Sequence, residues 1–105
     1  MAGIDSKVGA VLPGPGIMVP ITSFAPEPYD LLRHVVVVVQ PTEGGHTSGF
    51  FDANIHASGE TASEAINNLK SYIGDIFEEF LAIGRERLGP GPSHELTVLQ
   101  RYIQD

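Results

Sequence analysis

The sequence predicts one α+β domain, in which a small antiparallel sheet packs on a single long helix. Two observations support this fold class. Five consecutive valines, Val35 to Val39, indicate a buried strand, and apolar residues recur every three or four positions between residues 61 and 88. The chain has 105 residues, 42% of them hydrophobic, which suffices for one modest core. We expect an extended arm over residues 1–28 and a single domain over residues 29–105.

The N-terminal arm is rich in glycine and proline, with Pro-Gly-Pro-Gly at positions 13–16. Proline fixes φ and disfavours a helical conformation in the residue before it, so this segment should be extended. The apolar residues between Ile17 and Ile21 are expected to form an edge strand that is interrupted at Pro20. A single helical turn is expected over residues 29–32.

A β-hairpin is predicted next, with strands over residues 34–40 and 47–57 joined by a glycine-rich loop. The valine strand does not alternate with polar residues, so both of its faces must be covered. The long helix can cover one face. The other must be covered by the N-terminal arm, by a second copy of the protein, or by both, and we therefore expect a dimer or a higher homo-oligomer. In the second strand, the expected core face consists of Phe51, Ala53, Ile55 and Ala57, and the opposite face of Phe50, Asp52, Asn54 and His56.

The long helix is expected over residues 61–88 and should begin with a capping box. Thr61 can accept a hydrogen bond from the N–H of Glu64, whose carboxylate reaches back to the N–H of Thr61. Gly74 weakens the helix interior and is expected to permit close packing, and Leu88-Gly-Pro-Gly-Pro should end the helix. The apolar stripe consists of Ala65, Ile66, Leu69, Ile73, Ile76, Phe77, Phe80 and Ile83. The solvent side carries Asp75, Glu78, Glu79 and Glu86.

The C-terminal tail, residues 93–103, is compatible with two structures. Leu96, Leu99 and Ile103 have the spacing of a short amphipathic helix. Alternation through Leu96, Val98 and Tyr102 also permits a strand, although Gln100 would then face the core. We predict the helix.

The composition limits the classes of function. The chain has no cysteine, which excludes disulfides and thiolate chemistry, and no apolar run approaches membrane-spanning length. We therefore expect a soluble cytoplasmic protein with no membrane association. Thirteen acidic and six basic residues give a net charge of −7. This is the wrong sign for binding nucleic-acid phosphates, whereas it suits a basic protein partner.

The segment after the hairpin resembles the HicB-like antitoxin family. The matching residues, which follow the order of that family's Gly-Asp/Glu-Thr, Glu-Ala and Asn-Leu signature, are Gly59, Glu60, Thr61, Glu64, Ala65, Asn68 and Leu69. The resemblance covers roughly residues 34–85 and implies a small α+β unit that oligomerises and pairs with a small basic toxin. The family's usual Pro-x-Leu-Pro-Gly-Cys loop is missing between the second strand and the helix, and we expect no DNA-binding segment after the tail. We therefore expect a small orphan member of the family that does not bind DNA.

Two surfaces are candidates for binding a partner. One is the polar strand face of Asp52, Asn54 and His56, and the other is the acidic helix face of Asp75, Glu78 and Glu79. The leading hypothesis is a non-enzymatic protein-interaction domain, an antitoxin or antitoxin-like regulator. The alternative is a small-molecule or metal-binding module of an oligomer, since the strand face offers oxygen and imidazole ligands. No local spacing suggests a catalytic triad, and no catalytic residue, resident metal or cofactor is predicted.

Overall fold

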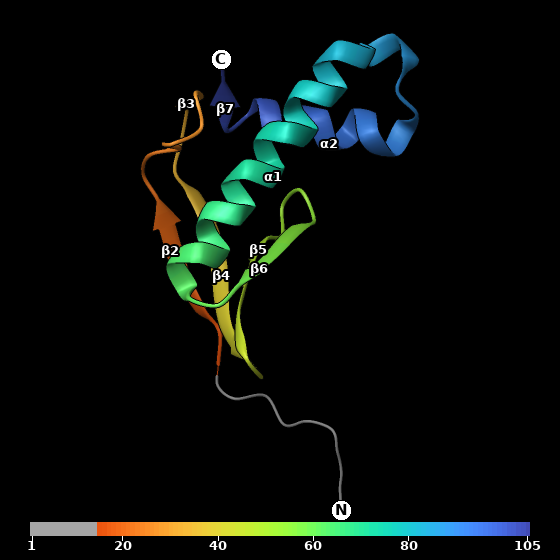
Figure 1. Ribbon diagram of the computed structural model, residues 1–105. Helices are drawn as coiled ribbons and strands as arrows, with labels where there is room; N and C mark the ends of the chain where they lie inside the picture. The colour runs from red at the N-terminus through yellow and green to blue at the C-terminus, as the bar shows by residue number, and fades with distance from the viewer. Residues whose placement is uncertain (1–14) are drawn as a thin grey trace, which may run out of the picture.

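The computed structural model describes residues 15–105, and the first fourteen residues of the predicted arm lie outside this range. It confirms the α+β fold class, because a four-stranded antiparallel sheet packs against one long helix and a shorter helix follows (Figure 1). The strand order is β2-β4-β5-β6. In the described part of the chain, no helix combines the length and apolarity needed to cross a membrane. The elements are β2 (Ile17–Ile21), β3 (Asp30–Leu31), β4 (Val35–Thr42), β5 (Gly45–Phe50), β6 (Ile55–Gly59), α1 (Ala62–Ile83), a 3₁₀ turn (Arg85–Arg87), α2 (Pro90–Gln100) and β7 (Ile103–Gln104).

The valine strand β4 has one covered face and one open face. Val35, Val37 and Val39 are buried on the side of the sheet that α1 crosses (Figure 1). Val36 and Val38 point to the opposite side, where Val36 is 44% exposed. Within the described chain, the second face of the strand is therefore not covered by a helix.

The described part of the predicted arm belongs to the main sheet. The predicted edge strand is confirmed as β2, although its pairing with β4 continues through Pro20, which lies opposite Val36. Ile21 and Phe24 are buried in the core, so this segment helps to build the domain.

The predicted helical turn over residues 29–32 is wrong. Asp30 and Leu31 form β3 and pair with β7 at the C-terminus. The N–H of Leu32 also donates to the carbonyl of Tyr102 at 2.7 Å. The main-chain groups of this segment are thus satisfied by a partner far away in the sequence, which outweighs the local helical preference.

The predicted second strand, residues 47–57, consists of two strands separated by a turn at residues 51–54. The N–H of Ala53 donates to the carbonyl of Phe50, and Asn54 adopts a positive φ of 56°. Asp and Asn are common turn residues because they tolerate such conformations. The turn reverses the two phenylalanines relative to the prediction, since Phe50 is buried and Phe51 is 61% exposed. Ala53, Ile55 and Ala57 are buried as predicted.

The loop between the first two hairpin strands is also shorter than predicted. β4 continues to Thr42, β5 starts at Gly45, and only Glu43 and Gly44 form the turn. Gly44 has a φ of 87°, which a residue with a side chain adopts at a cost. The hairpin therefore has a two-residue loop, which fixes its hydrogen-bond register.

The capping box of α1 is confirmed with one difference. The N–H of Glu64 donates to the Thr61 hydroxyl at 3.0 Å, but the Glu64 carboxylate accepts from the N–H of Glu60, at 2.6 Å. The helix ends at Ile83 and not at residue 88, because Gly84 has a φ of 90° and donates its N–H to the Phe80 carbonyl. The predicted tail helix is confirmed as α2, which begins three residues before the predicted tail segment and ends at Gln100. Ile103, which was predicted on the apolar face of this helix, instead lies in the strand β7.

Candidate functional site

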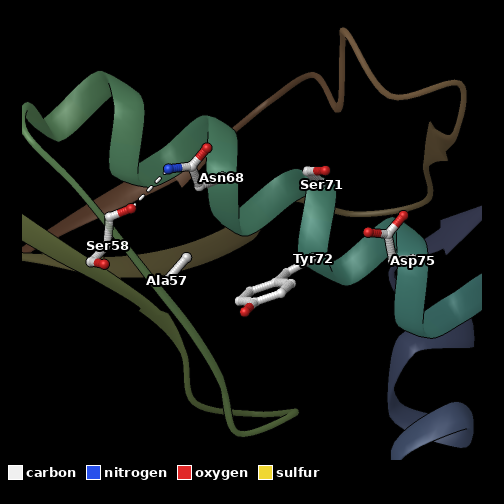
Figure 2. A pocket seen from close by; sticks show the side chains of 6 residues that line it. All are labelled: Ala57, Ser58, Asn68, Ser71, Tyr72 and Asp75. Carbon is white, nitrogen blue, oxygen red and sulfur yellow. Dashed lines mark hydrogen bonds between the residues drawn. The ribbon is translucent and has the colours of Figure 1, made fainter.

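A concave surface runs between the outer side of β6 and α1. Its centre is a hollow of about 300 Å³ (Figure 2). Two further hollows adjoin it. The first, about 430 Å³, lies at the β4–β5 turn and shares Ser58 and Asn68 with the centre. The second, about 390 Å³, lies toward α2 and shares Tyr72 and Asp75 with the centre. The three hollows form one continuous surface, which we call the β6–α1 groove.

The entry to α1 determines the shape of the groove. Gly59 ends β6 directly beside the first helical turn, where a Cβ would lie only 2.7 Å from the main-chain nitrogen of Ala65. A glycine is needed for this close approach. The first two turns of α1 bring the Asn68 side chain to β6. There its Nδ2 donates to the Ser58 carbonyl at 2.8 Å (Figure 2). The strand and the helix are therefore joined at the centre of the groove by a side chain.

The groove is lined by acidic residues at both ends. Within residues 15–105, no lysine or arginine lines any of its three hollows. Burial raises the pKa of the Glu95 carboxyl above its usual value. Although this shift favours the neutral form of Glu95, the other five acidic residues give the groove a negative potential that attracts positive charge. The acidic residues are Glu43, Glu60 and Glu64 at the β4–β5 turn, and Asp75, Glu79 and Glu95 toward α2.

The part of the groove toward α2 also offers apolar surface. Tyr72 is 55% exposed and lines both the central hollow and the hollow toward α2, where Ile55 and Ile76 lie beside it. His56 borders the same hollow, and its Nε2 lies 3.3 Å from Oδ1 of Asn54. An exposed aromatic ring next to carboxylates can bind a basic side chain, because the ring packs against its aliphatic stem and the carboxylates attract its charged end.

The structure brings four of the six predicted interface residues together, although two come from the strand hypothesis and two from the helix hypothesis. Asn54, His56, Asp75 and Glu79 line one hollow. The other two, Asp52 and Glu78, are engaged elsewhere. Asp52 accepts a hydrogen bond from the Tyr102 hydroxyl, and Glu78 accepts one from the Tyr29 hydroxyl at 2.8 Å.

The two tyrosines that bind these carboxylates have altered acidity. Burial, with a further contribution from the Glu78 hydrogen bond, raises the pKa of Tyr29 to about 12. The hydrogen bond to Asp52, together with burial, raises the pKa of Tyr102. Both hydroxyls therefore remain protonated donors near neutral pH, and they position Asp52 and Glu78 as parts of the scaffold.

The groove residues that were absent from the predicted site include Asn68, Tyr72 and Glu95. Asn68 belongs to the family signature but carried no predicted role. Tyr72 is an aromatic residue outside the apolar stripe of the helix, and this position was a signal that the sequence offered. Glu95 lies on α2, and its distance from the other groove residues in the sequence gave no indication that it would join them.

Chemistry at a metal centre receives no support from the side-chain arrangement. Across residues 15–105, no three His, Asp or Glu side chains are grouped so as to hold a metal ion.

Comparisons with protein-family models, with curated proteins and with solved structures found no match. The candidate site therefore depends on its own geometry and charge.

Proposed function

We propose that this protein is a cytoplasmic, non-enzymatic interaction domain that binds a basic segment of a partner protein in the β6–α1 groove. The observation that carries the proposal is the lining of the groove, in which acidic residues occupy both ends and the described part of the chain contributes no lysine or arginine. Complementary charge accelerates encounter with a basic partner and disfavours acidic competitors. The exposed Tyr72 ring adds the aromatic contact that is typical of interface hot spots.

An antitoxin-like role is the biological form of this proposal that fits best. The resemblance to the HicB-like family implies a small basic protein as the partner. Four residues of the matching signature line the groove: Gly59, Glu60, Glu64 and Asn68. The acidic character of the whole chain, with a net charge of −7, favours the same class of partner.

The affinity of a basic probe peptide tests this proposal. The probe is a nine-residue peptide of alternating lysine and valine, measured by fluorescence anisotropy against the intact protein. The double variant Asp75→Asn, Glu79→Gln should weaken binding by about tenfold, since exposed charge pairs contribute up to roughly 1 kcal/mol each. The matched control Glu86→Gln, Asp105→Asn changes the net charge equally at exposed positions that do not line the groove.

The control should bind the probe as the wild type does. Equal losses in the two double variants would show that only net charge matters, and no binding of the probe by the wild-type protein would refute the proposal. Binding should also weaken as salt is added, because exposed charges are screened beyond about 8 Å at physiological ionic strength.

We further propose that a second copy of the protein covers the open face of the sheet. The strand register places no charged side chain on this face, so two copies that each carry a net charge of −7 can approach through it. Met18 is 74% exposed there and Val36 is 44% exposed. Exposed apolar surface of this kind is typical of interfaces between proteins. The side chains on this face are Met18, Pro20, Val36, Val38, Gln40, Thr42, Thr47, His56 and Ser58.

A further inference from the structure

We infer that the basic partner segment binds as an additional β-strand on the outer edge of β6. This inference rests on the proposed function and specifies how the groove is used. It predicts that main-chain hydrogen bonds supply affinity, and that the acidic residues select which segment binds.

The edge of β6 is open to strand addition. Among residues 15–105, the one strand of the sheet that pairs with β6 is β5. A five-residue strand is about 17 Å long, since each residue advances roughly 3.3 Å. Strands that end a sheet present unpaired main-chain groups to an incoming strand.

The hydrogen-bond register identifies which groups of β6 face outward. The two-residue turn at Glu43-Gly44 makes Thr42 and Gly45 a hydrogen-bonded pair, and such pairs alternate along an antiparallel ladder. Alternate residues of β5 therefore direct their main-chain groups toward β4 and toward β6. In the β5–β6 ladder, the same alternation directs the main-chain groups of His56 and Ser58 away from the sheet. The bond from Asn68 to the Ser58 carbonyl agrees with this independently, because that carbonyl accepts from a side chain and lies outside the β5–β6 ladder.

Asn68 supplies one hydrogen bond that an added strand would otherwise provide. Its amide is held against the edge by a single exposed side-chain contact. An incoming strand can replace that contact with a main-chain N–H, and the Asn68 side chain can rotate away. Beside it, the exposed ring of Tyr72 lies where side chains of the added strand would pack.

The opposite edge of the sheet is protected. β2 contains Pro20, and the same alternation directs the nitrogen of this residue outward. Proline has no N–H to offer and is a common means of preventing strand addition at an exposed edge. β6 contains no proline. The protein therefore blocks one edge of its sheet and leaves the other open.

The charge of the groove determines the occupant. A second copy that paired β6 with β6 would bring its own acidic residues beside Asp75, Glu79 and Glu95, and like charges would oppose that pairing. A segment that carries lysine or arginine at every second position would instead place positive side chains along one side of the added strand. We therefore assign the edge to an extended basic segment of a different protein.

The contribution of main-chain hydrogen bonds to affinity is tested with two peptides that have identical side chains. The probe is again the nine-residue lysine–valine peptide, and its twin carries N-methyl groups on its central main-chain nitrogens. Strand addition predicts that the twin binds at least tenfold more weakly than the probe. Equal affinities would overturn strand addition while leaving the acidic groove as the binding site. If neither peptide binds, the proposed function fails as well.

A pair of protein variants tests the same inference by changing β6 in place of the peptide. Ser58→Pro removes one of the outward N–H groups of β6, and in this respect it resembles Pro20 on the opposite edge, whereas Ser58→Ala retains this N–H. Ser58→Pro should lower the affinity for the probe at least tenfold relative to Ser58→Ala, with both variants shown to be folded by circular dichroism. Equal affinity of the two folded variants would overturn the inference. Should Ser58→Pro not fold, the peptide twins still decide the question.

Discussion

Replacing Gly74 with alanine should destabilise the protein, although alanine favours a helix interior by about 1 kcal/mol over glycine. Gly74 is buried at the contact between α1 and the segment that precedes β3. An added Cβ would lie 3.1 Å from Cε2 of Tyr29 and 3.2 Å from Oε1 of Glu27. The first distance is shorter than the roughly 3.5–4.0 Å that two carbon atoms prefer.

The ring of Tyr29 cannot easily move to accommodate the methyl group. It packs edge to face against Phe24 and Phe77, with centroid distances of 6.2 and 5.5 Å. Its hydroxyl is bound to Glu78 at 2.8 Å. Overpacking of this kind costs about 1–3 kcal/mol. After the helix propensity gain of about 1 kcal/mol is subtracted, the net loss of stability is about 1 kcal/mol.

Thermal and denaturant unfolding followed by circular dichroism measure this loss. For a domain of about 100 residues, a loss of 1 kcal/mol lowers the Tm by roughly 4–8 °C. The control is the same substitution in a Tyr29→Leu background, where the ring edge is absent and alanine should be neutral or stabilising. A Gly74→Ala variant as stable as the wild type, or more stable, would refute the packing argument.

Three further outcomes are expected. Val36→Glu should convert the proposed oligomer to a monomer, whereas the control Leu81→Glu, at a position on α1 that is 40% exposed, should not. Light scattering distinguishes the monomer from the oligomer, and a monomeric wild-type protein would refute the interface. The raised pKa of Tyr29 favours its neutral form in the folded state, so its contribution to stability is complete below pH 10 and is lost as the pH rises through about 12. Tyr29→Phe should lack this alkaline loss in unfolding midpoints measured across that range, and an unchanged pH profile would contradict the assignment. Thr61→Ala should lower the free energy of unfolding by about 1 kcal/mol through loss of the N-cap, as measured by its urea midpoint, and a midpoint equal to that of the wild type would contradict it.

Local chemistry explains which elements were predictable from the sequence. The start of α1 was predicted because Thr61 and Glu64 determine it through hydrogen bonds to neighbouring residues. The predicted end of α1 lies too far along the chain because a single glycine is compatible with a helix interior, whereas the positive φ of Gly84 ends the helix before the more conspicuous Gly-Pro segment. The turn at residues 51–54 was missed because Phe51, Ala53 and Ile55 imitate the alternation of a strand.

The candidate site was predictable in its residue types but not in its arrangement. Asp75 and Glu79 were predicted on a helix face, and Asn54 and His56 on a strand face, as two separate surfaces. They line one hollow because α1 runs beside β6 after the turn at Gly59. Such proximity depends on tertiary packing, which residue spacing within a single element does not encode.

The two proposed surfaces differ in a way that allows both to be used at once. The open sheet face carries no charged side chain and suits a second copy of an acidic protein, whereas the β6–α1 groove is acidic and suits a basic partner. Thr42, His56 and Ser58 belong to both surfaces. A dimer formed through the other end of the open face, at Met18, Pro20 and Val36, would leave both grooves accessible. Two linked grooves bind a partner with two basic segments far more tightly than either groove alone, because the second contact is intramolecular. Dimerisation through an uncharged face would thus strengthen recognition by the charged one without any change in the groove itself.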